Sequence, residues 1–263
     1  MDAKEIEIRY WAALGVVREA GRLAAEQYHR RSELDVERKG PQDLVSEADR
    51  ACEDMIVGAL HKLFPDDGFL GEERGAQNAG SSVTWIIDPI DGTANFLRGI
   101  PLWCVSLGLL AGNDFVIGVI YNPITEELYA ARQGKGATLN GKSIEVSQAK
   151  SLGEARLGIG FSHREPVALH AEAIKRLLDA ECEYSRLGSG ALGLAFTADG
   201  RLDGFWEVHI NSWDVAAGLC IVKEAGGQIN DFLSDDGLTK GNPVLATTPH
   251  LYAPLSTLLK MAP

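Results

Sequence analysis

The chain has 263 residues, of which 45% are hydrophobic and 24% charged, values typical of a globular protein with a substantial core. Its 25 Lys and Arg residues are outnumbered by 37 Asp and Glu residues, and the net charge of −12 argues against binding to nucleic acid or to an anionic membrane. The charged N-terminus and the lack of a long apolar run argue against a signal peptide and a membrane span, so we expect a cytoplasmic protein.

The first half of the chain begins with two helical patterns. Apolar residues recur at helical spacing over residues 3–29, which predicts a long amphipathic helix. A second helix is expected after Ser46, because Ser46 and Asp49 have the spacing of a capping box and Pro65 follows the apolar positions. Short β-like runs separated by turn residues then predict an antiparallel sheet. These runs are residues 84–88, 103–110, 115–121 and 127–131.

The second half follows Gly136 and the pair Asn140-Gly141, which is typical of a hairpin turn. Strand-like and helix-like segments alternate there, which predicts an α/β half. The strand-like segments are residues 155–160, 183–187, 204–209, 228–231 and 244–247, and the helix-like ones are 167–178, 191–198, 215–225 and 251–261. No repeat or linker is visible, so we expect an α+β half over residues 1–145 and an α/β half over residues 146–263, packed as one body.

The segment Asp88-Pro89-Ile90-Asp91 follows an apolar strand. Pro89 removes a backbone donor and argues against continued strand pairing, so a turn is expected after Asp88. In such a turn Asp88 and Asp91 can project to the same side, close to the Ile90 carbonyl. Carboxylate and carbonyl oxygens are the donors that Mg²⁺ prefers, and the segment therefore predicts a metal site.

Gly92 and Thr93 come next and lead into residues 94–96, where a short helix is expected to begin. The free N–H groups of a helix start can bind a phosphate, which would place an anion site beside the cation site. The alternative is a simple turn in which the acidic residues and the glycine are only turn formers. Two acidic residues on either side of a proline, directly before Gly-Thr, favour the functional interpretation.

Two further acidic segments stand on either side of this motif. Glu72 and Glu73 follow the short apolar segment 69–71, where a strand end could direct one carboxylate to the same cluster. Asp214 lies in the first turn of an expected helix, where capping or stabilisation of the helix dipole explains an acidic residue equally well.

Taken together in order and spacing, Glu72-Glu73, the segment from Asp88 to Thr93 and Trp213-Asp214 resemble the inositol monophosphatase family of lithium-sensitive, metal-dependent phosphatases. The resemblance covers nearly the whole chain. It implies a layered αβαβα sandwich of the inositol monophosphatase and fructose-1,6-bisphosphatase type, with α+β and α/β halves and the site between them. It also implies a homodimer.

The resemblance implies a set of metal ligands as well. Glu72, Asp88 and the Ile90 carbonyl would hold one Mg²⁺, while Asp88, Asp91 and Asp214 would hold a second. Glu72 with waters would hold a third, weaker ion, so two or three ions are expected. Such ions can activate a water for attack on phosphorus and stabilise the leaving oxygen.

The catalytic roles implied by the resemblance fall on Thr93, Asp49 and Glu72. Thr93 would orient or deprotonate the attacking water, with its hydroxyl held by Asp49, and the N–H groups of Gly92 and Thr93 would bind phosphate oxygens. Asp49 also fits a capping role at the start of its helix. Lys39 could approach the substrate or metal-bound waters, although a lone lysine is more often part of a solvated face.

The family includes phosphatases of several alcohols, so the residues that contact the alcohol must select among them. Glu207, seven positions before Asp214, matches an acidic residue that binds ring hydroxyls in inositol-type members, which favours a polyol phosphate. The turn Gly188-Ser189-Gly190 matches a segment that contacts the polyol, although Ser189 also fits a helix cap. Asp91 and Asp214 would touch the substrate too. Arg164, in the 162–164 loop, could bind a second anionic group or belong to an exposed loop.

We therefore expect an Mg²⁺-dependent phosphomonoesterase that hydrolyses inositol monophosphate. Histidinol phosphate is the nearest alternative. Bisphosphorylated nucleotides and fructose bisphosphate rank lower, because Arg164 and Arg186 are the only evident basic candidates for a second phosphate. A regulatory binding protein is the alternative from another class of function.

Overall fold

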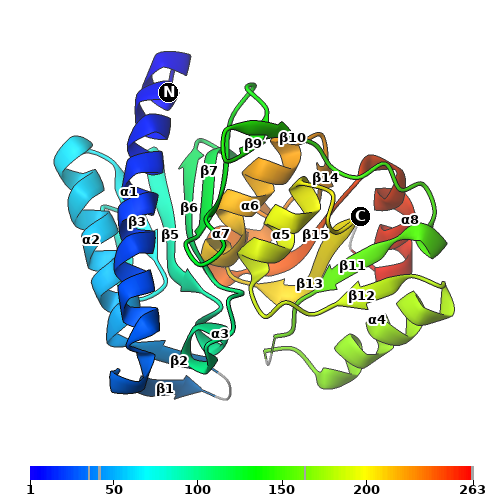
Figure 1. The fold of residues 1–263 in the computed structure, drawn as a ribbon. Helices are drawn as coiled ribbons and strands as arrows, with labels where there is room; N and C mark the ends of the chain where they lie inside the picture. Colours follow the sequence, from blue (N-terminus) through cyan, green and yellow to red (C-terminus); the bar gives the residue numbers. More distant parts are fainter. Residues whose placement is uncertain (35, 41–42, 163, 262–263) are drawn as a thin grey trace.

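The computed structural model describes residues 1–34, 36–40, 43–162 and 164–261. Within these residues, helices and sheets alternate in five layers (Figure 1). Helices α1 and α2 cover the eight-stranded sheet, α5 and α6 lie between that sheet and the five-stranded one, and α4 and α8 cover the far side. The expected layered αβαβα sandwich is confirmed.

The eight-stranded sheet has the order β10-β9-β8-β7-β6-β5-β3-β4. Neighbouring strands from β5 to β8 are antiparallel, as the turn-separated runs predicted, and β3 runs parallel to β5. Asn140 and Gly141 both have positive φ and form the predicted hairpin turn. The strands are β3 Gly68–Gly71, β4 Gly75–Gln77, β5 Val83–Asp91, β6 Cys104–Ala111, β7 Asp114–Asn122, β8 Glu127–Arg132, β9 Ala137–Leu139 and β10 Lys142–Ile144.

The strand that carries the acidic motif is longer than expected. We predicted a turn after Asp88, but β5 continues through Pro89 to Asp91. Asp88 pairs with Ser106 and Asp91 with Cys104, so β5 has one more residue than β6 over this stretch. A bulge of this kind accommodates a proline without a ladder hydrogen bond and redirects the neighbouring side chains. The chain turns at Gly92 instead, where φ is +95°.

Helices α1 Ala3–His29 and α2 Glu47–Leu63 pack on one face of this sheet and confirm the two helices predicted from periodicity. Asp2 and Glu5 form a capping box at the start of α1. The buried stripe of α1 includes Ala13, Val17, Ala20 and Ala24, whose spacing of three or four residues keeps them on one face. The side chain of Ser46, which we expected to cap α2, lies outside the described residues. Strands β1 Val36–Gly40 and β2 Asp43–Ser46 form a separate antiparallel pair.

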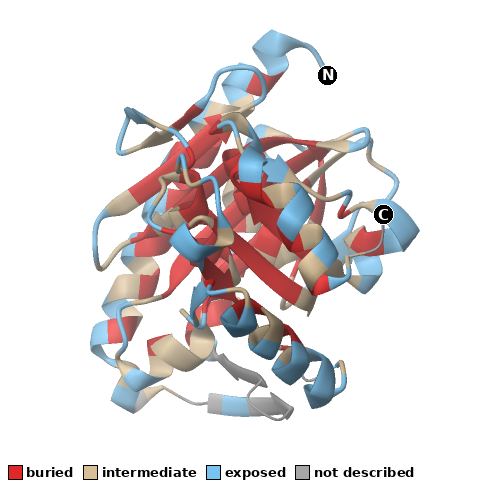
Figure 2. Cartoon of the chain, turned by 90° about the vertical axis from the view of Figure 1, so that its right-hand side faces the viewer, coloured by how far each residue is buried: buried red, intermediate tan, exposed pale blue. Residues whose placement is uncertain are grey.

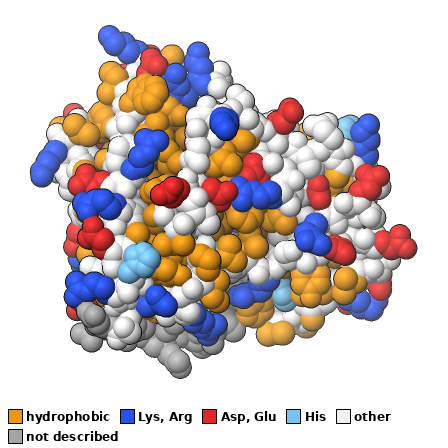
Figure 3. Space-filling view, viewed as in Figure 1, with side chains coloured by type: hydrophobic (Ala, Val, Ile, Leu, Met, Phe, Trp, Pro, Cys, Tyr) orange, Lys and Arg blue, Asp and Glu red, His pale blue; other side chains and the backbone are white. Residues whose placement is uncertain are grey.

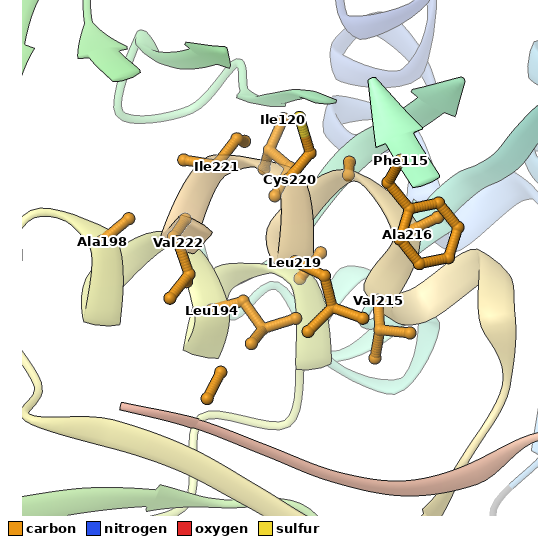
Figure 4. Close-up of a cluster of buried hydrophobic side chains, with 14 of the residues drawn as sticks. Phe115, Ile120, Leu194, Ala198, Val215, Ala216, Leu219, Cys220, Ile221 and Val222 are labelled. Atoms are coloured by element: carbon orange, nitrogen blue, oxygen red, sulfur yellow. The ribbon is translucent and has the colours of Figure 1, made fainter. Parts of the chain in front are cut away.

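Helices α5 Gly190–Ala198 and α6 Ser212–Glu224 fill the layer between the sheets and are buried over most of their length (Figure 2). Figure 4 shows their apolar side chains packed with those of the first sheet. Gly108 and Gly118 face each other on β6 and β7. A Cβ at Gly108 would lie 2.8 Å from the Cβ of Ala216. The two glycines therefore let α6 approach the sheet closely, with its N-terminus over the end of β5.

The five-stranded sheet has the order β12-β11-β13-β15-β14. Its first three strands are parallel, while β15 is antiparallel to both β13 and β14, so the predicted α/β half contains a mixed sheet. Our proposed division after residue 145 falls between β10 and β11. The strands are β11 Arg156–Ile159, β12 Glu183–Ser185, β13 Gly204–Ile210, β14 Gln228–Ile229 and β15 Asn242–Thr247. The remaining helices are α3 Thr93–Arg98, α4 Val167–Asp179, α7 Gly237–Lys240 and α8 Pro249–Leu259, with short 3₁₀ turns at Arg31–Glu33, Leu152–Glu154 and Ser234–Asp236.

The surface carries side chains of both charges. On the face shown in Figure 3 acidic and basic groups are interspersed, with hydrophobic side chains between them. In the described part of the chain, no helix has the length and apolar character needed to cross a bilayer.

Asp67 anchors α1 to the first sheet. Its carboxylate accepts hydrogen bonds from Arg9 Nε and Nη2 at 2.9 and 2.8 Å, and from Trp85 Nε1 at 3.0 Å. The carboxylate of Asp67 is nearly completely buried. We expect Asp67→Asn to lower the free energy of unfolding by about 2 kcal/mol, because it removes the charge and one acceptor oxygen from this network. Urea denaturation would measure the change. Glu26→Gln, at the exposed Arg22–Glu26 pair, should change it by less than about 0.5 kcal/mol; equal effects would contradict the prediction.

Candidate active site

Three carboxylates meet where β5 ends against the start of α6. Asp88 and Asp91 come from the bulged end of β5, and Asp214 comes from the first turn of α6. One oxygen from each lies within 4.8 Å of the others. Asp88 and Asp91 are buried, and Asp214 is partly buried. The structure therefore brings together three of the predicted metal ligands from distant parts of the chain.

Asp91 is held by the first turn of α5. The Ser189 hydroxyl donates a hydrogen bond to Asp91 Oδ2, and the backbone N–H groups of Gly190 and Ala191 donate to Oδ1 and Oδ2 at 3.3 and 2.7 Å. The Cys104 thiol lies 3.8 Å from Oδ2. A carboxylate at a helix N-terminus is stabilised by these N–H groups and by the helix dipole. Ser189 also caps α5 through Leu192 N, so its capping and site contacts occur together.

Asp88 and Asp214 have local partners of their own. Asp88 Oδ1 accepts a hydrogen bond from the Ile90 N–H at 3.0 Å. Asp214 Oδ2 accepts one from the Asn211 N–H at 3.1 Å, as part of a capping box at the start of α6. The capping role that we considered for Asp214 is thus present, and it leaves the carboxylate within the cluster.

Burial raises the pKa values of all three carboxyl groups, and repulsion by neighbouring carboxylates raises those of Asp88 and Asp214 further. Burial is the largest cause for Asp88, whose pKa is raised further by the charges of Glu72, Asp91 and Asp214. The pKa of Asp91 is raised by burial and lowered by its hydrogen bonds to α5. The pKa of Asp214 is raised to about 7, again first by burial and then by Asp91. Carboxylates that repel one another in a buried site favour a bound cation or bound protons.

Glu72 lies at the end of β3, beside the cluster. It stands outside the group of three whose oxygens meet within 4.8 Å, but its charge is the largest charge contribution to the raised pKa of Asp88. Glu72 also lines the same pocket as Asp91 and Asp214. The strand end therefore directs this carboxylate towards the cluster, as the sequence predicted.

Thr93 connects the cluster to α2. Its hydroxyl lies 3.0 Å from the Ile90 carbonyl oxygen and 3.3 Å from Asp49 Oδ1. Asp49 is buried in the first turn of α2. Gly92, with φ +95°, forms the N-cap of α3, so the predicted helix start after the motif is present. The side chain of Lys39 lies outside the described residues.

The other wall of the pocket comes from the second half of the chain. Gly188 has φ +79° and lies against Asn95 of α3. Asn95 Nδ2 donates hydrogen bonds to the carbonyl oxygens of Leu187 and Leu102 at 2.8 and 2.7 Å. Asn95 therefore fixes the 188–190 turn beside Gly92. Sequence reasoning named Asn95 only as part of the short helix, because a single Asn carries no signal for a contact 92 residues away.

Glu207 lies on β13 and lines the same pocket, of about 840 Å³. It is 7% exposed, and a Cβ on Gly160 would overlap its carboxylate, so only glycine leaves room there. Burial raises the pKa of Glu207, and the charges of Asp214 and Asp91 raise it further, while Arg186 and Arg164 oppose the shift.

Basic residues line the same pocket as the carboxylates. Arg98, Arg164 and Arg186 are all among its lining residues, together with Ser162. His163 lies outside the described residues. The pocket therefore combines acidic residues of the cluster, a buried glutamate and three arginines, and Ser162 and Arg164 are part of its lining.

Comparison with known proteins identifies the family of this chain. Residues 7–259 match the inositol monophosphatase family. The chain belongs to this family. It is 42% identical to an inositol-1-monophosphatase of Mesorhizobium japonicum over 236 residues, which cover 86% of this chain and 88% of that one. It is 37% identical to the Nus factor SuhB of Pseudomonas aeruginosa over 94% of both chains. The crystal structure of the suhB protein of Bartonella henselae superposes with a TM-score of 0.89 at 36% identity, covering 96% of this chain and 98% of that one.

Members of the inositol monophosphatase family are metal-dependent phosphatases, and the residues of this chain fit a divalent cation. The donor set consists of oxygens, which suit hard cations such as Mg²⁺. In addition to burial, the charges of Glu72, Asp91 and Asp214 raise the pKa of Asp88, and the charge of Asp91 raises that of Asp214, so a bound cation would relieve repulsion within the cluster. Asp88, Asp91 and Asp214 would hold such an ion.

The raised pKa of Asp214 predicts a pH dependence. Because this pKa is about 7 in the folded protein and near its usual 3.8 when unfolded, the metal-free folded state binds more protons between these values. The free energy of unfolding should therefore fall as the pH rises through this window. Mg²⁺ relieves the same repulsion, so it should raise the melting temperature more at pH 8 than at pH 5.

Thermal denaturation with and without Mg²⁺ at the two pH values measures this difference. Asp214→Asn should reduce both the pH dependence and the gain from Mg²⁺, since it removes the titrating charge. An equal gain from Mg²⁺ at pH 5 and pH 8 in the wild type would contradict the prediction.

Proposed function

We propose that this member of the family hydrolyses inositol monophosphate to inositol and phosphate with Mg²⁺. The observation that carries the proposal is that Asp91 and Asp214 of the carboxylate cluster line one pocket together with Glu72, the start of α3 and Glu207. Two or three Mg²⁺ ions, held by Glu72, Asp88, Asp91, Asp214 and the Ile90 carbonyl, would supply the positive charge that activates water and stabilises the leaving oxygen.

The residues around the cluster prepare the reacting groups. The Thr93 hydroxyl, between Asp49 and the Ile90 carbonyl, orients the attacking water and passes its proton towards Asp49. The N–H groups of Gly92 and Thr93, at the start of α3, bind the phosphate oxygens. Glu72 lies beside Asp88 and helps to position the same water. Water attacks phosphorus directly, so no covalent enzyme intermediate is required.

Glu207 and the 188–190 turn bind the alcohol. Glu207 is buried in the pocket wall, where a carboxyl group gains most from hydrogen bonds to ring hydroxyls. Ser189 and Gly190 lie next to Asp91, so an alcohol bound there sits beside the metal cluster. The proposal also includes a cytoplasmic homodimer that is inhibited by lithium.

Phosphate release from inositol 1-phosphate tests the reaction. Activity should require Mg²⁺, and Asp88→Asn and Asp91→Asn should each lower kcat/KM by about 100-fold or more, because each removes a metal ligand. Asp114→Asn, at the exposed Asp114–Lys223 pair, is the control and should leave the activity unchanged. A folded wild-type protein that binds Mg²⁺ but releases no phosphate from this or any related ester would refute the proposed phosphatase activity.

The choice of alcohol is tested at Glu207. Glu207→Ala should lower kcat/KM for inositol 1-phosphate by about 10- to 100-fold, the equivalent of one or two hydrogen bonds to a charged group. It should leave Mg²⁺ affinity and the hydrolysis of p-nitrophenyl phosphate, which has no ring hydroxyls, nearly unchanged. An equal loss of kcat/KM on the two esters would show that Glu207 acts on the phosphate reaction itself and not on the alcohol.

Arg164 and Arg186 favour a second candidate, a substrate with an additional anionic group. Both line the pocket, and among the described residues neither guanidinium group has a hydrogen bond or an ion pair, while the backbone N–H of Arg164 donates to Ser162 Oγ. Arginine pairs readily with phosphate or carboxylate groups. Turnover of inositol 1-phosphate, histidinol phosphate, 3′-phosphoadenosine 5′-phosphate and fructose 1,6-bisphosphate, measured side by side, separates these candidates. A preference for a bisphosphate that Arg164→Ala abolishes would favour the second.

A regulatory binding function is the alternative from another class, and relatives named Nus factor SuhB make it worth testing. The buried carboxylate cluster supports catalysis, and the net charge of −12 argues against direct RNA binding. The activity assay with Asp91→Asn distinguishes an enzyme from a protein that acts only by binding.

A further inference from the structure

Helix α2 carries two buried carboxylates one turn apart. Asp49 contacts Thr93 and belongs to the site described above. Glu53, four residues later, is completely buried but has no part in the proposed mechanism. Residues four apart lie on the same face of a helix, so both side chains point towards the first sheet. A fully buried Glu needs strong partners, and those of Glu53 indicate its role.

The partners of Glu53 are the two peptide N–H groups that follow Glu72. Glu73 N donates to Glu53 Oε2 at 2.8 Å, and Arg74 N donates to Oε1 at 2.9 Å. These bonds are made to the backbone, so they fix the path of the chain rather than one side chain. Burial raises the pKa of Glu53, and these two hydrogen bonds oppose that shift.

The peptide of Glu72 itself is bound on the other side. Glu72 N donates to the carbonyl oxygen of Ile87, the residue directly before Asp88, at 3.2 Å. The N–H groups of residues 72–74 are therefore all hydrogen-bonded, the first to β5, which carries Asp88, and the other two to the Glu53 carboxylate. The backbone of Glu72 is held between β5 and α2.

Gly71 makes this arrangement possible. A Cβ at this position would overlap the Glu53 carboxylate, so any larger residue would displace the carboxylate or the strand end. The backbone of Gly71 is in an ordinary β-strand. The requirement for glycine therefore comes from the space that Glu53 occupies and not from its φ angle.

We propose that Glu53 is a positioning residue, which holds the chain on the far side of Glu72 and so sets the metal affinity of a site that it does not touch. This inference rests on the proposed role of Glu72 as a metal ligand. Groups that orient metal ligands commonly change metal affinity by about 10- to 100-fold when they are removed. Glu53 fulfils that role through the backbone of the segment that bears the ligand.

Two nearby carboxylates provide matched controls. Asp54 is the next residue on α2 and binds the Arg74 side chain at the surface, so it touches the same loop without holding its backbone. Asp67 is a buried carboxylate whose stabilising hydrogen bonds come from Arg9 and Trp85 and not from the segment that bears Glu72. Asp54→Ala tests contact with the loop alone, and Asp67→Asn tests a general loss of stability.

The experiment measures metal binding and activity separately. Metal-free wild-type protein, Glu53→Gln, Glu53→Ala, Gly71→Ala and both controls are titrated with Mn²⁺, and free Mn²⁺ is followed by electron paramagnetic resonance. The Mg²⁺ dependence of phosphate release is measured on the same samples. We expect the Mn²⁺ dissociation constant to rise about 10- to 100-fold in Glu53→Ala and Gly71→Ala, and less in Glu53→Gln, which retains one acceptor oxygen.

At saturating Mg²⁺, kcat of the Glu53 variants should recover to within a few-fold of the wild-type value, with KM for the ester nearly unchanged. Unchanged Mn²⁺ affinity in folded Glu53→Ala or Gly71→Ala would overturn the proposal, as would an equal rise in Asp67→Asn or Asp54→Ala. If the wild type binds Mn²⁺ but hydrolyses no ester, the proposed function fails while the Mn²⁺ titrations still decide the role of Glu53.

Discussion

The contact between Asp91 and the first turn of α5 joins the two sheets at the site. Asp91 ends a strand of the first sheet, and α5 lies in the layer between the sheets. Its carboxylate accepts hydrogen bonds from Ser189, Gly190 and Ala191, which are about 100 residues away in the chain. The negative charge of Asp91, which a cation would balance, is thus also stabilised by the positive end of the α5 dipole. The position of the 188–190 turn relative to the carboxylate cluster depends on this contact.

Repulsion within the cluster explains why each carboxylate has backbone partners. Asp88 is bound by the Ile90 N–H and Asp214 by the Asn211 N–H, as Asp91 is by α5. These bonds stabilise the charged forms and keep three buried carboxylates close together before any ion binds. A carboxylate has two oxygens with several lone pairs. It can therefore accept a hydrogen bond at a helix cap and still have lone pairs left to bind a cation. The capping and metal-binding interpretations of Asp214 are therefore compatible.

The family resemblance of the acidic motif implied the layered fold and most of the site residues. The strand and helix periodicities, which are local features, predicted most of the individual elements. The predicted turn after Asp88 was wrong, since a bulge depends on the register with β6, which local sequence does not encode. The contacts of Asn95 and Glu53 could not be predicted for a related reason. Their partners are backbone groups, which any residue type supplies, so no pattern of side chains marks them.

Close packing gives the site its precision. Gly108 and Gly118 let α6 lie directly on the first sheet, which places Asp214 over the end of β5. Gly160 leaves room for the buried Glu207 in the same way. Because these glycines have no side chain, the neighbouring element or side chain can approach closely. That close approach determines the positions of the Asp214 and Glu207 carboxylates. A methyl group added at Gly108 would act on the cluster through the position of α6, although Gly108 lines no part of the pocket.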